Sequence, residues 1–168
     1  MDHTMSAEQA ALKSRIRKLA QEKIKPLAQK YGETDQVPQE IVEQLAKEGL
    51  FRLLFPQEYG GTGISAVNIC IVREQLAQVS AIADVTFAMQ ALGGYPIVFA
   101  GSDEQKQEFL PKLAEGKLMT TFALTESQAG SDVAGLQCAA QEKDDYFIIN
   151  GNKRFISNGF RADIGILF

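Results

Sequence analysis

Residues 122–132, with the sequence Phe-Ala-Leu-Thr-Glu-Ser-Gln-Ala-Gly-Ser-Asp, lie where the patterning of the chain changes. Before about Lys117, apolar residues recur every three or four positions, whereas after it the period is nearer to two. The stretch continues a strand predicted for residues 119–124 and ends as a polar loop of small residues. We therefore predict an α+β protein, in which an N-terminal all-α helical bundle precedes a truncated β-barrel or sheet domain.

The loop in this stretch contains groups that can bind an anion. Its small residues let a ligand approach the backbone, and its hydroxyl and N–H groups can donate to a diphosphate. The sequence is neither a GxGxxG fingerprint nor a Walker loop, so no general phosphate-binding motif applies. An ordinary polar turn without a ligand is the alternative interpretation.

The first part of the helical region predicts two helices. An apolar stripe from Leu12 to Tyr31 indicates one helix, which Pro26 is expected to kink without ending it, because the stripe continues in phase. Pro38 suits the first position of a second helix, where the missing N–H has no consequence, and Gly49 suits its end.

The remaining helices are predicted from their caps and breaks. Ser65 and Ser102 are expected N-caps, and Gly93-Gly94 is expected to separate an apolar helix from a short one that Gly101 ends. The helices predicted for the whole region span residues 12–31, 38–48, 66–79, 82–92, 95–100 and 103–115.

The region after Lys117 predicts strands at residues 119–124, 137–141, 146–149, 153–157 and 164–168. Asn150-Gly151, between two of these segments, is the strongest short-range signal for a hairpin turn. The apolar last segment would expose its ladder groups unless something covered it, which indicates a β domain that stops partway. We thus expect residues 1–117 to form a helical domain and residues 118–168 to begin an incomplete β domain.

Composition and charge argue against several classes of function. The chain has 17 basic and 21 acidic residues, a net charge of −4 and a pI near 5.1, which disfavour nucleic-acid binding and a basic membrane-surface helix. We expect no membrane span, no secretory leader and a cytoplasmic location. Cys70, Cys138 and the single histidine, His3, are too few and too far apart for a metal site.

Eight short pieces of sequence, in their order and spacing, resemble the N-terminal half of the acyl-CoA dehydrogenase family. They are PQEYGGTG at 56–63, GSDEQK at 101–106, LP at 110–111, Gly116, FALTE at 122–126, AGSD at 129–132, INGNK at 149–153 and FISNG at 155–159. Each is weak alone, but together they extend over nearly the whole chain. The resemblance implies the family's N-terminal helical domain and the start of its middle β domain, with its C-terminal helical domain absent.

The resemblance also implies FAD as the cofactor and an acyl-CoA thioester as the substrate. By position, the cofactor-binding residues would be Phe122, Ala123, Leu124, Thr125, Gly130, Ser131, Phe155, Ile156 and Ser157. Ser131 would also bind substrate, because the FAD diphosphate and the nucleotide part of the thioester both pass there. The Ser157 hydroxyl would be aimed near flavin N5, the atom that accepts the hydride.

Four positions depart from the family's pattern. The family usually has Trp at Phe155, Thr at Ser157 and Pro-Gly at Ser127-Gln128. A phenylalanine ring can still stack on a flavin with less area, and serine keeps the hydroxyl.

The activity implied by the resemblance is α,β-desaturation of an acyl-CoA in fatty-acid β-oxidation. A carboxylate removes the α-proton while a hydride passes from the β-carbon to flavin N5. The family's catalytic glutamate lies in the C-terminal domain, so we assign no catalytic residue and expect little activity from this chain alone. Glu126, although inside the motif, is interpreted as structural. An electron-transfer flavoprotein and a homo-oligomer are the implied partners.

Two alternatives remain open. Acyl-CoA oxidases and flavin monooxygenases share the implied architecture and differ in the reaction of reduced flavin with oxygen. The chain could also be a catalytically inactive fragment that serves as an interaction module, which binding of FAD to the purified chain would test.

Overall fold

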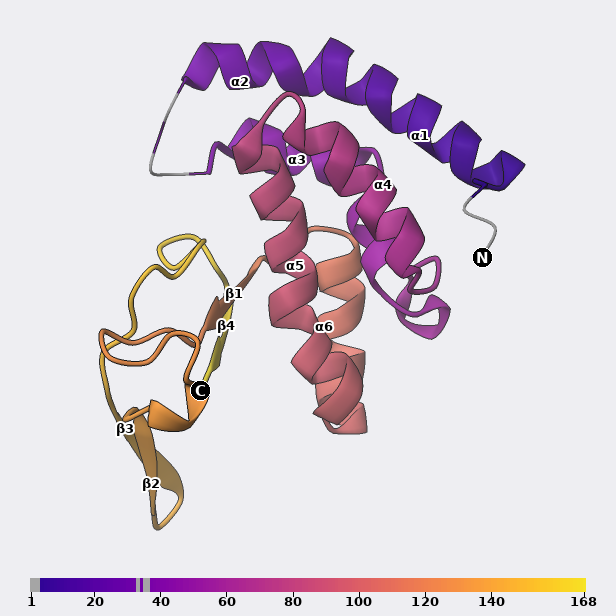
Figure 1. Cartoon of the computed structure of the whole chain (residues 1–168). Coiled ribbons are helices and arrows are strands. Elements are labelled where there is room, and N and C mark those ends of the chain that lie inside the picture. Colours follow the sequence, from indigo (N-terminus) through magenta and orange to yellow (C-terminus); the bar gives the residue numbers. More distant parts are fainter. Residues whose placement is uncertain (1–3, 33, 35–36) are drawn as a thin grey trace.

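Helices occupy the first two thirds of the chain and short strands the rest (Figure 1). The computed structural model describes residues 4–32, 34 and 37–168, so His3 lies outside the described residues. The α-helices are α1 (Ala7–Leu19), α2 (Lys25–Tyr31), α3 (Gln39–Lys47), α4 (Ala66–Ala77), α5 (Ala81–Ala100) and α6 (Asp103–Ala114). The strands are β1 (Thr120–Ala123), β2 (Ala139–Lys143), β3 (Tyr146–Asn150) and β4 (Ile164–Leu167). The predicted α+β class, with a small sheet region after a helical domain, is confirmed.

Serine caps begin several of these helices. Ser65 and Ser102 accept hydrogen bonds from the backbone N–H groups three residues on, as predicted, and Ser80 caps α5 in the same way. At Ser102 the side chain of Gln105 also accepts from the Ser102 N–H, which completes a capping box. A cap of this kind contributes about 1 kcal/mol to helix stability.

The first helix continues past Pro26, as predicted. α1 runs through a π-helical segment, Ala20–Ile24, directly into α2, and Pro26 lies in the first turn of α2. Proline is tolerated there because its missing N–H and fixed φ match the start of a helix. The change in winding therefore comes one turn before the proline rather than at it.

The predicted break at Gly93-Gly94 is wrong, because α5 runs unbroken through both glycines. Both are there for close packing. A Cβ on Gly93 would lie 2.5 Å from Cβ of Thr120, and one on Gly94 would lie 2.6 Å from Cε1 of Phe55. Close approach of β1 and of an aromatic ring explains the glycine pair, and helix packing outweighs its low helix propensity.

By length and composition, α5 is also apolar enough to cross a membrane. The expectation of no membrane span therefore does not follow from length and apolarity alone. Buried core helices pass the same test, and α5 contacts α3, α4, α6 and β1. Its position is that of the central helix of a folded core.

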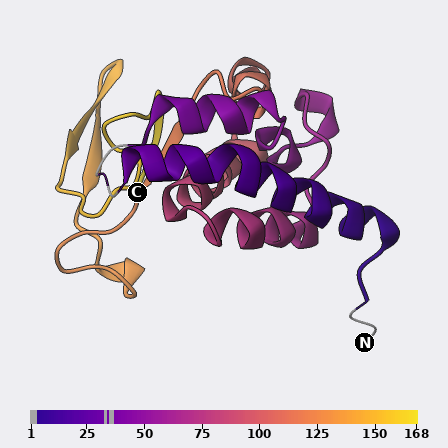
Figure 2. The ribbon, with the colours of Figure 1, turned by 90° about the horizontal axis from the view of Figure 1, so that it is seen from above.

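The core lies around α5, between the other helices. α1 packs on α4, and α4 packs on α5. α6 also packs on α5 (Figures 1 and 2). The largest fully buried side chains are Phe51, Phe55, Phe87, Ile16, Ile24, Ile41, Leu45, Leu50, Leu54, Leu76, Leu110 and Leu113. Burying side chains of this size stabilises the fold by about 1.5–3 kcal/mol each.

The strands form two small two-stranded sheets. β1 and β4 pair in parallel, with Thr120 opposite Ile164, and β1 also contacts α5. β2 and β3 form an antiparallel hairpin that extends away from the helices (Figure 1). The predicted strands at residues 119–124 and 164–168 are confirmed with shorter bounds.

The prediction of a hairpin turn at Asn150-Gly151 is wrong. The turn lies at Asp144-Asp145. Lys143 pairs with Tyr146, and Asp144 has a φ of 55°, the left-handed conformation that such turns require. The strand predicted at residues 153–157 is absent, because Phe155 has a φ of 57°, which interrupts an extended backbone. Gly151 instead lies against Cys138, where a Cβ would come within 2.6 Å of Sγ.

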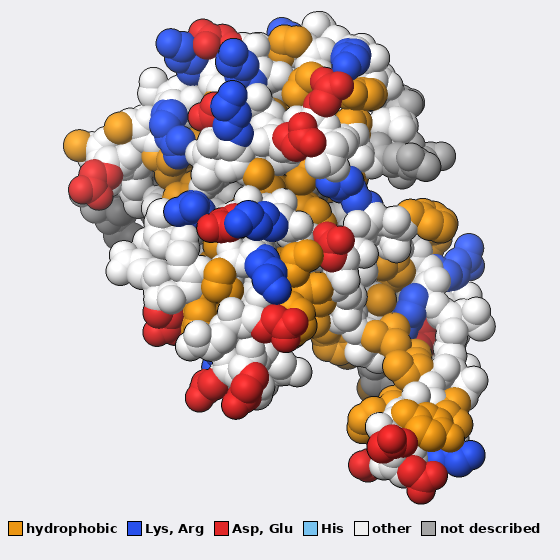
Figure 3. All heavy atoms as spheres, turned by 180° about the vertical axis from the view of Figure 1, so that it is seen from behind, with side chains coloured by type: hydrophobic (Ala, Val, Ile, Leu, Met, Phe, Trp, Pro, Cys, Tyr) orange, Lys and Arg blue, Asp and Glu red, His pale blue; other side chains and the backbone are white. Residues whose placement is uncertain are grey.

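Apolar side chains are exposed on this hairpin. Phe147 and Ile149 of β3 are 64% and 55% exposed. Figure 3 shows orange side chains gathered at the end of the hairpin beside acidic and basic ones. The hairpin thus contributes little to the core of the described chain.

Candidate functional site

Hydrogen bonds join the segment around Thr125 to the segment around Ser157, although about thirty residues separate them. The N–H of Arg154 donates to the carbonyl of Thr125 over 2.8 Å. Thr121 Oγ1 donates to the Ser157 carbonyl over 2.7 Å, and Asn158 Nδ2 donates to the Thr120 carbonyl over 3.3 Å. The strand β1 therefore acts as the common support of both segments.

A buried ion pair lies at the centre of this arrangement. Lys153 Nζ lies 2.8 Å from Glu126 Oε1, and the side chains of the pair are 8% and 3% exposed. The hydrogen bond from Lys153 and those from the N–H groups of Gln137 and Cys138 lower the pKa of Glu126 to about 2. Glu126 is therefore ionised at neutral pH, and both of its carboxylate oxygens already accept hydrogen bonds. This agrees with its interpretation as a structural residue.

The residues predicted on β1 and its loop lie in two environments. Phe122 is half-buried with its ring centroid 4.6 Å from that of Phe168, and Ala123, Leu124 and Thr125 are also half-buried. Gly130 and Ser131 are exposed. The chain thus offers a half-buried strand end followed by an exposed loop.

The second predicted segment is more exposed. Phe155 is 84% exposed, with the Arg154 guanidinium 5.0 Å from its ring centroid. Ile156 is half-buried, while Ser157 is exposed. Phe155 has a positive φ of 57°, and its ring lies at the surface although the following residues contact β1.

Two cavities lie next to Ser157. One of about 230 Å³ is bounded by the start of α5, through Ala81, Ile82 and Val85, and by Ser157 and Asn158. The other, of about 540 Å³, is bounded by Val37 and residues 156–161. Thr125 and Ser131 line neither cavity. Hydrogen bonds to the backbone join the segment around Thr125 to the segment around Ser157. Only the segment around Ser157 borders the two cavities.

Sequence reasoning missed Asn158 and Arg161 as candidates. Asn158 Oδ1 and Arg161 Nε are buried without a hydrogen-bond partner among the described residues, and both side chains border the larger cavity. Asn158 has a φ of 64°, which asparagine tolerates better than most residues. An asparagine followed by glycine was the available signal, because that pair favours positive φ.

Two domain families match the chain. The acyl-CoA dehydrogenase N-terminal domain matches residues 6–117, and the acyl-CoA dehydrogenase middle domain matches residues 121–168. Among curated proteins, an acyl-CoA dehydrogenase of Bacillus subtilis is 34% identical over 165 residues, which cover 98% of this chain and 44% of the relative.

Solved structures agree with this similarity. Butyryl-CoA dehydrogenase from Megasphaera elsdenii superposes with a TM-score of 0.89 at 30% identity, over 99% of this chain and 45% of that one. A glutaryl-CoA dehydrogenase from Mycobacterium smegmatis in complex with FADH2 gives 0.90 at 27% identity, over 97% and 42%. A chain in the electron transferring flavoprotein structure from Acidaminococcus fermentans gives 0.91 at 30% identity, over 99% and 44%. This chain spans less than half the length of each of these proteins.

Proposed function

The chain belongs to the acyl-CoA dehydrogenase family, and from that premise we propose that it is the N-terminal part of an FAD-dependent acyl-CoA dehydrogenase. The observation that carries the proposal is the match of both domains in order along the chain. We also propose a domain boundary between residues 117 and 118, where the helices give way to β1.

The donor groups after β1 are compatible with FAD. The hydroxyls of Thr125 and Ser131 make no hydrogen bond within the described part of the chain. Gly130 has open space where a Cβ would stand. The Ser131 hydroxyl and an uncrowded glycine backbone suit a diphosphate, which accepts hydrogen bonds and needs close approach. The Thr125 hydroxyl is available for the flavin ring.

In the proposed mechanism, bound FAD supplies the hydride acceptor for α,β-desaturation. Thr125 and Ser157 would donate hydroxyl hydrogen bonds to the flavin ring, and Phe155 would stack on it. The fixed Ser157 carbonyl holds that residue in place before any ligand arrives. We assign the α-proton to a carboxylate outside the two matched domains, as in the family, so no residue of this chain is the base.

The wider assignments follow from the same premise. We propose an acyl-CoA thioester as the substrate, with Ser131 near its nucleotide part, and an electron-transfer flavoprotein as the electron acceptor. A cytoplasmic location, a homo-oligomeric complete enzyme and a role in β-oxidation belong to the same proposal.

Titration of the purified 168-residue chain with FAD tests the proposal. We expect quenched flavin fluorescence and a shifted absorbance band, with weaker binding in Ser157→Ala than in the wild type. Ser14→Ala, on the exposed side of α1, is the matched control. A wild-type chain that leaves the flavin spectrum unchanged would contradict the proposal and favour an inactive interaction module.

A further inference from the structure

We propose that Glu126 and Lys153 are a positioning pair, which holds residues 124–138 in the shape that receives FAD. This inference rests on the proposed function. It gives a role to an ion pair that the proposed mechanism leaves unused.

Glu126 closes the loop on itself. Its Oε2 accepts from the Gln137 N–H over 2.8 Å and from Gln128 Nε2 over 2.7 Å, and its Oε1 accepts from the Cys138 N–H over 2.9 Å. The carboxylate thus fixes the far end of the loop to its beginning. Gly130 and Ser131 lie within the segment that it closes, and Thr125 directly precedes it.

Lys153 joins the closed loop to the second predicted segment. Its Nζ donates to Glu126 Oε1 and also to the Leu124 carbonyl, over 2.8 and 2.9 Å. The next residue, Arg154, donates its N–H to the Thr125 carbonyl. Lys153 therefore sets the spacing between Thr125 and the Phe155–Ser157 segment, both of which the proposed flavin ring would contact.

The pair also balances charge. A diphosphate is an anion, and a buried carboxylate near it would oppose binding unless a cation neutralised it. Loss of Lys153 would leave the Glu126 charge buried and unpaired, which is more harmful than loss of both groups.

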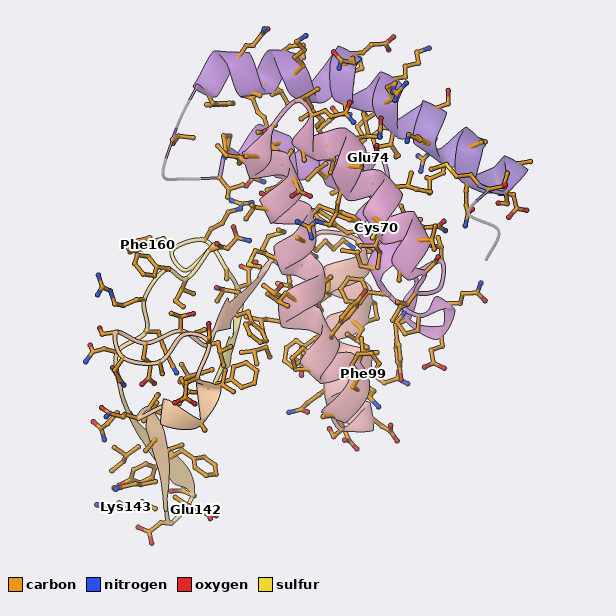
Figure 4. All side chains as sticks on the ribbon, in the orientation of Figure 1. Cys70, Glu74, Phe99, Glu142, Lys143 and Phe160 are labelled. Atoms are coloured by element: carbon orange, nitrogen blue, oxygen red, sulfur yellow. The ribbon has the colours of Figure 1, made fainter. Side chains whose placement is uncertain are left out.

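The test measures the FAD dissociation constant of the full chain by fluorescence quenching. We compare the wild type with Glu126→Gln, Lys153→Met, the double variant and Lys153→Arg. Glu142→Gln and Lys143→Met are matched controls, because both residues lie at the exposed end of the β2–β3 hairpin (Figure 4).

We expect Glu126→Gln to raise the dissociation constant about tenfold, which is the effect if the competent loop falls to about a tenth of the population. Lys153→Met should raise it further, the double variant should bind better than Lys153→Met, and Lys153→Arg should restore most of the affinity. The controls should stay within twofold of the wild type.

Hydrogen exchange supplies a readout that needs no FAD. The amides of Gln137 and Cys138 should exchange faster in Glu126→Gln, while the amides of α5 keep their protection. Circular dichroism of the helices checks that each variant folds.

The outcomes separate the two proposals. A wild type that binds FAD, with Glu126→Gln and Lys153→Met within twofold of it, overturns the positioning role and leaves the proposed function standing. Equal affinity of Lys153→Met and the double variant, or of Lys153→Arg and Lys153→Met, overturns the charge argument. A wild type that does not bind FAD overturns the proposed function and this inference together.

Discussion

Replacement of Gln90 by leucine should destabilise the junction between the helical and strand regions. Gln90 is fully buried in α5. Its Nε2 donates to the carbonyls of Leu113 and Leu118 over 2.9 and 2.7 Å, and its Oε1 accepts from the Thr120 N–H over 3.2 Å. One side chain therefore satisfies backbone groups at the end of α6, in the following turn and at the start of β1.

Leucine has a similar volume but cannot replace these three hydrogen bonds. The Leu118 carbonyl and the Thr120 N–H would lose their partner, at about 1–3 kcal/mol each, whereas the Leu113 carbonyl keeps the N–H of Gly116. Because the turn after α6 can relax, we expect a loss near the lower bound, about 2–4 kcal/mol in total. With a urea slope of roughly 2 kcal/mol/M, the midpoint should fall by about 1–2 M.

Urea denaturation followed by circular dichroism measures this loss. Gln107→Leu, at an exposed position of α6, is the matched control and should change stability by less than about 0.5 kcal/mol. A Gln90→Leu variant within about 1 kcal/mol of the wild type would refute the reasoning, because the Leu118 carbonyl and the Thr120 N–H would then have lost their partner at almost no cost.

Three further predictions follow from the packing, the caps and the ion pair. Gly94→Ala should destabilise the chain by about 1–3 kcal/mol in urea denaturation, because its Cβ would lie 2.6 Å from the buried Phe55 ring; a more stable variant would contradict this. Ser102→Ala should lose about 1 kcal/mol and lower Tm by about 2–4 °C, whereas Ser102→Thr should nearly retain both. Because the folded-state pKa of Glu126 is depressed to about 2, its stabilising contribution should be complete above pH 4.5 and lost as pH falls from there towards 2. Urea midpoints against pH should therefore fall less steeply for Glu126→Gln, and parallel curves would count against the ion pair.

The helices could be predicted because their signals are local. Serine caps and apolar spacing placed α4 and α6 to within a few residues, since each signal acts within one or two turns. The helix break predicted at Gly93-Gly94 is wrong because these glycines serve contacts with residues far away in the sequence. Their partners, Thr120 and Phe55, are distant in sequence, and only the folded structure brings them together.

The hairpin shows the same limit in the strand region. Asn150-Gly151 has stronger turn propensity than Asp144-Asp145, yet the ladder closes at the aspartates. The pairing of Ala139 with Asn150 places Gly151 against Cys138. Gly151 therefore allows close packing against Cys138 and does not form the turn. Tertiary contacts outweighed a preference worth a fraction of a kcal/mol.

The candidate site was predicted in part. Residues around Thr125 and Ser157 came from the resemblance, and whether they bind FAD stays a prediction. The buried partners that organise them, above all Lys153, could not be found from the sequence. A lysine in a polar segment is usually exposed, and only the fold places its ammonium group against Glu126.

The parallel pairing of β1 with β4 has a consequence for the order of folding. Met119 and Asp163, which meet where these strands begin, are 44 positions apart, whereas α4 and α5 are joined by a short turn. Contacts between distant positions form after local ones, because the intervening chain must first lose the entropy of closing a long loop. The helical core should therefore assemble early and act as the template, with the loop that carries Thr125 gaining its final shape in the last and slowest step.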